Sequence, residues 1–447
     1  MAKPSKPRFF KPAAKQDKAL PWSKAGLRIE RISREGRGIA RHNGKIVFVD
    51  GALPQENVLA RCTASQRSFD EARVLSIVDT SPQRVEPFCP VAERCGGCQL
   101  QHWDLSAQRQ HKEQELFLEL KKLQPNIMCE SALLSAGQSF RHRLKLAVQP
   151  ANDFALAMRQ ESSHDLVILA HCPIATGGIN KTIKTLPALL KECGGLSQLT
   201  DMDIDEDTQG EIGLVLRFSK APIDSVIERL SQLLRDAGVT ALAVLCSVDK
   251  KSWKTIYQQG HLQLNIQTST KPCSLAYRPG DFTQTNWALN QQMIETALNW
   301  LSPQVHESAL DLFAGIGNFS LPLAQQVKQL HGFELSEAMV NAARINADIN
   351  QLSNARFTAQ DLFADKPQLP DADIAIIDPP RAGAESVCKS LANQSTLKRL
   401  VYISCNPATL VRDSAILQAG GLTPVKAAFV DMFAYTGHSE AMVLFVR

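Results

Sequence analysis

Short apolar runs separated by polar turns cover most of the chain, and their spacing changes from one part to the next. In the first part, brief apolar runs predict strands at 27–32, 38–41, 45–49, 56–61 and 71–78. Glycines, prolines and the pair Asn43-Gly44 separate these runs, and an Asn-Gly pair favours a two-residue hairpin. The pattern therefore predicts a small β-barrel of about five strands.

A mixed pattern of strands and helices follows. It predicts a polar helix at 105–123, strands at 166–169, 213–218 and 242–248, and a helix at 223–234. The acidic run 201–207 is similar to a calcium loop, but Glu206 and Ile212 stand where an EF-hand requires Gly and Glu. We therefore interpret the run as a solvated loop within an α+β middle domain.

From residue 308 the chain alternates strands with helical segments, which is typical of a doubly wound α/β sheet. The first strand leads into the Gly-rich turn 314–318, and Glu334, Asp361 and Asp378 lie at the ends of the next three strands. Because ligands bind at the carboxyl ends of the strands in such a sheet, we expect these acids to surround a cofactor.

The Gly-rich turn narrows the choice of cofactor. A dinucleotide fingerprint would have a third glycine where Ser320 stands, and no P-loop lysine is present. The turn is closer to the Asp-x-Phe-x-Gly-x-Gly turn of methyltransferases that use S-adenosylmethionine. That cofactor carries no phosphate, so nearby acids are tolerable. The sequence therefore predicts S-adenosylmethionine as the cofactor.

Cys405 lies between a short apolar run, 400–403, and the helix-breaking pair Asn406-Pro407. This places it at the carboxyl end of a strand, although spacing alone favours a buried Cys that acts as a small hydrophobe. The motif Asp378-Pro-Pro-Arg381 ends the preceding strand and lacks the aromatic residue with which amine methyltransferases hold a base. A nucleophilic Cys405 would suit an unreactive carbon acceptor that needs covalent activation.

A second group of cysteines has the spacing of metal ligands. Cys89, Cys95 and Cys98 come from one loop around Gly96-Gly97, and Cys172, which like Cys89 precedes a proline, supplies a fourth thiol. Four thiolates suit either zinc or an iron–sulfur cluster. Because zinc sites favour paired knuckles and three of these cysteines share one loop, we favour a [4Fe–4S] cluster with a structural role over zinc. Three unrelated cysteines are the remaining alternative.

Composition excludes several classes of protein. The 447 residues are 44% hydrophobic and 21% charged, with no run long enough to span a membrane and no apolar signal-peptide core. Eleven cysteines, an odd number, do not suggest a secreted disulfide framework. We therefore expect a cytoplasmic protein of two or three domains with no membrane partner.

Positive charge is unevenly distributed, although the net charge is only +4. Residues 1–24 are rich in Lys and Pro, which predicts a disordered tail that either binds nucleic acid or only improves solubility. The predicted barrel has a basic face formed by Arg28, Arg31, Arg34, Arg37, Arg41 and Lys45. This face either binds RNA or is simply solvated. Likewise, Arg141, Arg143 and Lys145 would share one strand face, either as a phosphate-binding stripe or as a solvated surface.

From about residue 25 to 447 the chain resembles the uracil-5-methyltransferases of RNA, in particular those of bacterial 23S ribosomal RNA. The resemblance rests on the motifs above, on Phe282-Thr-Gln-Thr-Asn286, on the segment 404–410 and on Gly437-His-Ser-Glu440. It implies a basic tail (1–24), a TRAM, or OB-like, β-barrel that binds RNA (25–80), a central domain with a [4Fe–4S] site (81–275) and a Rossmann-like class I methyltransferase domain (276–447). It also implies that residues 100–130 can pack on the catalytic domain.

The same resemblance assigns the site residues. It implies Cys405 as the nucleophile, Glu440 as the base, and a monomer that methylates carbon 5 of one uridine in 23S ribosomal RNA. The residues that would bind S-adenosylmethionine are Gln284, Phe313, Asn318, Glu334, Asp361 and Asp378. Because a free Cys is mostly protonated near neutral pH, we expect an electropositive or base-assisted environment around Cys405. Ala434-Tyr435 departs from the Pro-His that the family would have there.

Two other functions stay open at this point. The target could be another ribosomal uridine or a transfer RNA, although the barrel and the four cysteines disfavour the transfer RNA enzyme. Alternatively, the protein could be an RNA-binding chaperone with an inactive methyltransferase domain, against which the complete set of site residues argues.

Overall fold

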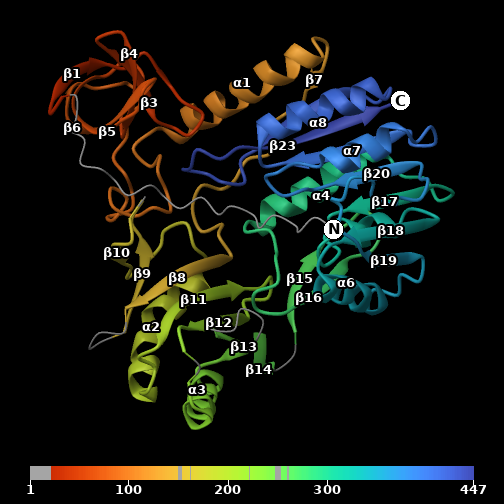
Figure 1. The fold of residues 1–447 in the computed structure, drawn as a ribbon. Helices are drawn as coiled ribbons and strands as arrows, with labels where there is room; N and C mark the ends of the chain where they lie inside the picture. Colours follow the sequence, from red (N-terminus) through yellow and green to blue (C-terminus); the bar gives the residue numbers. More distant parts are fainter. Residues whose placement is uncertain (1–21, 150–153, 162, 221, 247–252, 259–260) are drawn as a thin grey trace, which may run out of the picture. The chain divides into compact units, whose positions relative to one another are not determined.

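The computed structural model describes residues 22–149, 154–161, 163–220, 222–246, 253–258 and 261–447 (Figure 1). The chain forms two compact units that divide between Arg84 and Val85. Most of the predicted basic tail, residues 1–21, lies outside the described residues. Among the helices within the described ranges, none is both long and apolar enough to cross a membrane.

The first unit contains a six-stranded sheet in the order β1-β5-β6-β4-β3-β2. The predicted first strand, 27–32, divides into two because β1 pairs with β5 and β2 pairs with β3. Asn43 and Gly44 both have positive φ, 50° and 80°, which confirms the predicted hairpin between β3 and β4. The strands are β1 (Ala25–Arg28), β2 (Arg31–Ile32), β3 (Gly38–His42), β4 (Lys45–Asp50), β5 (Asn57–Ser65) and β6 (Phe69–Asp79).

A seven-stranded sheet in the order β10-β9-β8-β11-β12-β13-β14 forms the middle of the second unit. Helices α2 (Gly177–Cys193) and α3 (Asp224–Asp236) bury their apolar faces in one core with this sheet. The strands are β8 (Arg143–Gln149), β9 (Ala155–Arg159), β10 (Leu166–Ile168), β11 (Leu199–Glu206), β12 (Ile212–Phe218), β13 (Val239–Cys246) and β14 (Trp253–Gln258). The predicted α+β character of this region is confirmed.

The acidic run 201–207 is a strand and not the solvated loop that we expected. Asp203 and Asp205 lie in β11 and are buried, because arginines from the two neighbouring strands neutralise them. Arg217 of β12 binds both carboxylate oxygens of Asp203 at 2.6 and 2.5 Å, and Arg143 Nε of β8 lies 3.1 Å from Asp205 Oδ1. These ion pairs were not predicted because their partners are distant along the chain.

The predicted phosphate-binding stripe is therefore wrong in part. Arg143 is committed to Asp205 and also donates to the Asp281 carbonyl at 2.7 Å, and Arg141 precedes β8 instead of lying in it. Of the three predicted cations, only Lys145 is exposed. Arg143 thus compensates buried acids within the protein and does not contribute to an exposed basic stripe.

The catalytic half is an eight-stranded sheet in the order β19-β18-β17-β20-β21-β23-β22-β7. Strands β17 to β21 are parallel to their neighbours, and β23 runs antiparallel to β21. The elements are β7 (Met128–Cys129), β17 (Ser308–Leu312), β18 (Gln329–Glu334), β19 (Ala355–Ala359), β20 (Ile374–Ile377), β21 (Arg399–Ser404), β22 (Thr423–Val430) and β23 (Glu440–Val446). The chain order reverses between β17 and β20, which is the usual place for a ligand in an open sheet.

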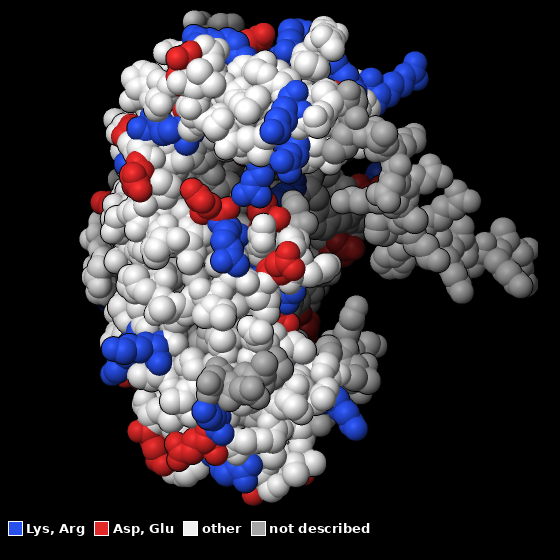
Figure 2. All heavy atoms as spheres, turned by 90° about the vertical axis from the view of Figure 1, so that its left-hand side faces the viewer, with Lys and Arg blue, Asp and Glu red and all other residues white. Residues whose placement is uncertain are grey.

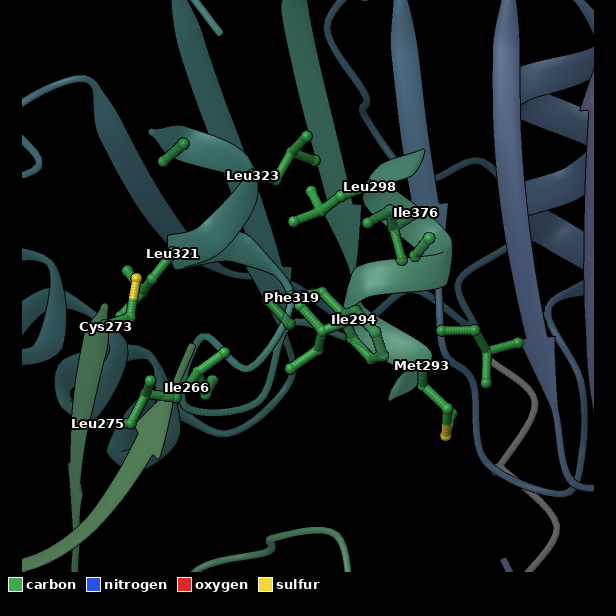
Figure 3. Close-up of a cluster of buried hydrophobic side chains, with 14 of the residues drawn as sticks. Ile266, Cys273, Leu275, Met293, Ile294, Leu298, Phe319, Leu321, Leu323 and Ile376 are labelled. Carbon is green, nitrogen blue, oxygen red and sulfur yellow. The ribbon is translucent and has the colours of Figure 1, made fainter. Parts of the chain in front are cut away.

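Helices cover both faces of this sheet. On one face, α4 (Trp287–Leu301), α5 (Ser320–Ala324) and α6 (Glu337–Ile349) share a core with the hairpin β15 (Leu262–Ile266) and β16 (Cys273–Tyr277). Figure 3 shows side chains of this core, such as Ile294, Phe319 and Ile376. On the other face, α1 (Leu105–Leu123), α7 (Glu385–Ala392) and α8 (Pro407–Ala419) share a second core.

Helix α1 and strand β7 precede the central domain in sequence but pack on the catalytic sheet. The predicted helix at 105–123 is confirmed with these limits, and Asp104 caps it by accepting from the Ala107 N–H at 2.9 Å. Leu116 and Leu120 enter the core beneath α8, and β7 pairs with the edge strand β22 (Figure 1). Residues near 100–134 thus belong spatially to the C-terminal half.

Candidate active site

The carboxyl edge of the catalytic sheet brings together the residues of the predicted chemistry. Asp378 follows β20, and Cys405 follows the neighbouring strand β21. Because β23 runs antiparallel, its first residue, Glu440, reaches the same edge, where Ala441 pairs with Ser404. The predicted position of Cys405 at the end of a strand is confirmed, and Glu440 lies beside it.

Asn406 holds the turn that carries Cys405. Its side-chain oxygen accepts from the Ala408 N–H at 3.1 Å and so caps α8, while its Nδ2 donates to the Arg381 carbonyl at 2.9 Å. The turn after β21 is thereby joined to the turn that follows Asp378. We had not assigned this role to Asn406, although an Asn before a Pro at a helix start is a recognisable N-cap.

The thiol of Cys405 lies in an acidic environment, which contradicts the electropositive alternative of our expectation and leaves the base-assisted one as a prediction. Burial raises the pKa of Cys405, the nearby Glu440 and Asp378 raise it further, and Arg381 and a backbone hydrogen bond oppose them. The acidic surroundings were not predicted because Glu440, just after a distant loop, could not be placed next to the thiol from spacing. The thiol therefore needs a proton acceptor or a cationic ligand to become the reactive thiolate.

The carboxyl groups at this edge also have raised pKa values. Burial and the neighbouring Asp378 raise the pKa of Glu440, while burial and Asp311 raise that of Asp378. Burial raises the pKa of Asp311 to about 7. Glu440 Oε2 is buried and has no hydrogen-bond partner among the described groups. A cationic ligand bound here would therefore relieve an unfavourable concentration of acids.

The Gly-rich turn bends sharply over the end of β17. Phe313, Gly315 and Gly317 all have positive φ, at 69°, 57° and 100°, and for Phe313 this conformation is strained. Glu334 at the end of β18 accepts a hydrogen bond from the Gly315 N–H at 3.3 Å and another from the Ser336 N–H at 3.0 Å. The Gly-rich turn and Glu334, which the sequence predicted to act together, are thus in contact.

The other predicted cofactor residues occupy the same edge with different partners. Gln284 Nε2 donates to Asp378 Oδ2 at 3.4 Å. Asn318 exchanges two amide hydrogen bonds with Asn290, at 2.8 and 2.9 Å, a partner that we had not predicted. Asp361 is exposed and accepts from the Phe363 N–H at 2.9 Å, and the ring of Phe363 lies 5.6 Å from that of Phe313.

A second unpredicted pair lies next to Cys405. Arg381 Nη2 is 2.9 Å from His438 Nε2, and burial together with Arg381 lowers the pKa of His438. His438 is therefore a neutral partner for the guanidinium. The motif that supplied Arg381 and the motif that supplied His438 were both recognised in the sequence, but their contact was not.

The four clustered cysteines lie around one buried region in the second unit. Cys98 and Cys172 pack with Phe140, Ile174 and Tyr435 in a small apolar cluster. Burial raises the pKa of Cys98 to about 12, and Cys172 and Cys95 raise it as well. The thiols of Cys95, Cys98 and Cys172 thus lie near enough to influence one another's pKa.

Local contacts hold the loops that carry these cysteines. The Cys89 N–H donates to Gln101 Oε1 at 3.2 Å, and the Cys172 N–H donates to Asn180 Oδ1 at 2.8 Å. A Cβ at Gly96 would lie 2.9 Å from the Arg159 carbonyl oxygen, so only glycine fits there. Nevertheless, no three His, Cys, Asp or Glu side chains in the described part of the chain are placed to hold a metal ion.

The doubly wound sheet, the strained Gly-rich turn after β17 and the acids at the carboxyl edge define a methyltransferase of the Rossmann-like class. The chain belongs to the tRNA (uracil-5-)-methyltransferase family, whose model matches residues 104–365 and 370–447. A TRAM domain model matches residues 26–75, which agrees with the predicted barrel.

Known relatives span almost the whole chain. A Hahella chejuensis protein named 23S rRNA (uracil(1939)-C(5))-methyltransferase RlmD is 35% identical over 450 residues, covering 97% of this chain and 100% of that protein. A Shewanella halifaxensis protein of the same name is 37% identical, with 98% of each chain covered. The crystal structure of Pyrococcus abyssi tRNA (uracil-54, C5)-methyltransferase with S-adenosyl-L-homocysteine has a similar fold, with a TM-score of 0.73 and 20% identity over 94% of this chain and 100% of that one.

Proposed function

We propose that this protein transfers a methyl group from S-adenosylmethionine to carbon 5 of a uridine in 23S ribosomal RNA. The observation that carries the proposal is the adjacency of Cys405 and Glu440 at the ends of paired strands, with Asp378 on the next strand. The proposal takes the substrate from the relatives, whose printed names specify uracil 1939 of 23S rRNA.

The carboxyl edge suits S-adenosylmethionine, which when bound supplies an electrophilic methyl group on a positively charged sulfur. Glu334 would accept hydrogen bonds from the ribose, and Phe313 and Asp361 would flank the adenine. Asp378, whose pKa is raised by burial and Asp311, would regain its charge beside the cationic part of the cofactor. Gln284 and Asn318 complete the proposed set, with their amides already oriented by Asp378 and Asn290.

In the proposed mechanism, Cys405 and Glu440 act on the uracil in sequence. The Cys405 thiolate adds to carbon 6 of the ring, and carbon 5 thereby becomes nucleophilic enough to take the methyl group. The Glu440 carboxylate then removes the proton from carbon 5. The electron pair of that C–H bond re-forms the double bond between carbons 5 and 6, and the carbon–sulfur bond breaks to release Cys405.

The barrel is the proposed site of sequence-independent RNA contact. Among its basic residues, Arg37 is paired with Glu71 and Lys45 with Asp70, whereas Arg28, Arg31, Arg34 and Arg41 are exposed. Figure 2 draws one face of the whole molecule, on which Lys and Arg side chains stand in separate groups with Asp and Glu between them. The exposed arginines of the barrel could hold RNA while the target base leaves its stack, which costs a few kcal/mol.

For the four-cysteine region we propose a [4Fe–4S] cluster bound by Cys89, Cys95, Cys98 and Cys172. The donor set supports it, since the buried thiols raise one another's pKa and a metal centre would neutralise their thiolates. Their arrangement in the described residues is not that of a formed metal site. Anaerobically purified protein should contain about four irons per chain, and stoichiometric zinc would contradict the proposal.

Methylation of defined RNAs tests the main proposal. The wild type should transfer a labelled methyl group to 23S rRNA, and mapping at single-nucleotide level should find one 5-methyluridine. Cys405→Ala should abolish both this transfer and any covalent adduct with 5-fluorouracil RNA. A fully active Cys405→Ala protein would exclude the mechanism.

Transfer RNA is the second candidate substrate, because the Pyrococcus abyssi tRNA enzyme shares the fold over nearly the whole chain. Both RNAs should therefore be offered in the same assay. Methylation of transfer RNA but not of 23S rRNA would keep the chemistry and overturn the proposed substrate.

A further inference from the structure

The segment 431–439 connects β22 to β23 and leads directly into Glu440, which also pairs with Val430 of β22. Glu440 is the first residue of β23, and its buried Oε2 has no hydrogen-bond partner among the described groups. The carboxyl group is therefore placed through the backbone that leads to it. The contacts that hold this segment therefore affect the proposed removal of the carbon 5 proton by Glu440.

Helix α1 anchors the beginning of the segment. Arg109 Nε donates to Asp431 Oδ2 at 2.8 Å, and Arg109 Nη2 donates to the Ser135 carbonyl at 2.5 Å. Lys112 Nζ donates to the Phe433 carbonyl at 3.2 Å and lies 3.9 Å from Asp431 Oδ1. Asp431 and Lys112 are only 2% and 5% exposed, so these contacts are largely shielded from water.

The four-cysteine region anchors the segment a second time, at Tyr435. The Leu100 N–H donates to the Tyr435 carbonyl at 2.9 Å, and the Tyr435 ring meets that of Phe88 edge-on at 5.1 Å. The same ring packs in the apolar cluster that contains Cys98. Tyr435 has a φ of 62°, a strained conformation that the surrounding contacts must maintain. Tyr435, which departs from the family pattern, is thus held both by a hydrogen bond of its backbone and by packing of its ring.

We propose that Tyr435 and Arg109 are positioning residues for Glu440, and that through Tyr435 the four-cysteine region holds the base of the reaction in place. The inference rests on the proposed function. The two anchored positions, Asp431 and Tyr435, precede Glu440 in the segment that leads to it. Neither Arg109 nor Tyr435 is assigned a contact with cofactor or uracil. Their removal should therefore affect proton removal from carbon 5 more than the preceding methyl transfer.

This selectivity has a measurable consequence. If Glu440 is displaced, the carbon 5 proton stays, the carbon–sulfur bond to Cys405 does not break, and the methylated RNA remains covalently attached. A displacement of about 1 Å can slow a reaction about a hundredfold. Covalent protein–RNA adduct should accumulate while binding of S-adenosylmethionine is unchanged.

The experiment compares multiple-turnover and single-turnover kinetics of the full-length protein with labelled S-adenosylmethionine and 23S rRNA. In Tyr435→Ala and Arg109→Met, we expect kcat to fall by about 10- to 100-fold, the fraction of label in denaturation-resistant adduct to rise, and the KM for S-adenosylmethionine to stay the same. Tyr435→Phe keeps the ring and should restore release of the product. Hydrogen exchange should accelerate in residues 431–439.

A matched control separates positioning from general stability. Arg399 Nη2 binds Glu307 Oε1 at 2.6 Å at the opposite end of β21, so Arg399→Met breaks a similar buried pair away from Cys405. This variant should lose stability without accumulating adduct. The inference is overturned if Tyr435→Ala and Arg109→Met show no adduct above the wild type, or if Arg399→Met shows as much. A wild type that methylates no RNA would instead refute the proposed function.

Discussion

Two groups of buried acids in this protein differ in whether a cation accompanies them. In the central sheet, Arg217 binds Asp203 and Arg143 lies against Asp205, which lowers the cost of burying these acids, although burial still raises the pKa of Asp205 to about 6. At the carboxyl edge of the catalytic sheet, Asp311, Asp378 and Glu440 have no ion pair within the described part of the chain, and burial raises the pKa of each. The cations thus offset part of the cost of burial in the first group, whereas the second group is an unfavourable arrangement in the absence of a ligand.

The difference indicates which acids were placed for chemistry. A protein gains stability by pairing or removing a buried carboxylate, so acids that are buried without a cation are retained for another reason. Here the missing positive charge matches the cationic methyl donor that we propose. The comparison predicts that removing an acid at the carboxyl edge should raise the stability of the ligand-free protein, whereas removing an arginine from the central sheet should lower it.

The largest effect is expected for Glu440→Gln. Methyl-transfer turnover should fall at least about a hundredfold because the proton acceptor is lost, and covalent protein–RNA adduct should be trapped on denaturing gels. The ligand-free variant should nevertheless be more stable than the wild type, since a buried group that is costly to ionise is removed. Activity assays and thermal unfolding of the same preparation measure both effects.

The sign of the pH dependence follows from the raised pKa of Glu440. A carboxyl group that binds its proton more tightly in the folded state contributes stability at low pH, and that contribution is lost as the pH rises above the unfolded-state value. The stability advantage of Glu440→Gln should therefore grow from about pH 5 to pH 8. An advantage that is constant over this range would mean that Glu440 is not buried as a neutral acid.

Several features of the fold and of the candidate site could be predicted from the sequence because their signals are local. Cys405 after an apolar run, Glu334 at a fixed distance from Gly315, and Asn43-Gly44 in a hairpin each depend on a few neighbouring residues. The pairs Arg143–Asp205 and Arg381–His438 join segments that are far apart in the chain, and no spacing rule reveals them. For the same reason the acidic surroundings of Cys405 were not predicted.

An effect of intermediate size is expected for Arg143→Met in the central sheet. It should lower the stability of the protein, whereas Glu440→Gln should raise it. Removing this guanidinium leaves Asp205 buried without its cation, which should lower the free energy of unfolding by about 3 kcal/mol. Activity per folded molecule and affinity for RNA should not change, because Arg143 is committed to internal partners. Denaturant unfolding and RNA-binding titrations measure the two quantities.

Lys145→Met is the matched control for this change. Lys145 lies on the same strand but is exposed, so its removal should alter stability by less than about 0.5 kcal/mol. If Arg143→Met instead weakened RNA binding with a smaller salt dependence, the discarded phosphate-binding stripe would have to be reinstated.

The smallest effect, and the most direct probe of the uncompensated acids, is the reactivity of Cys405 itself. Glu440 and Asp378 raise its pKa, so at a given pH less thiolate is present than in a neutral environment. In Glu440→Gln one of these charges is gone, and alkylation of Cys405 at neutral pH should become severalfold faster, with its pH profile displaced to lower pH. Mass spectrometry of the Cys405 peptide measures the rate, and Cys405→Ala identifies background labelling.

Bound S-adenosylmethionine should displace the pH profile of Cys405 alkylation in the same direction in the wild type, because its positive charge acts as the cation that this edge lacks. An unchanged profile in both cases would mean that the acids do not control the thiol, and the distinction between the two groups of carboxylates would then be one of location only.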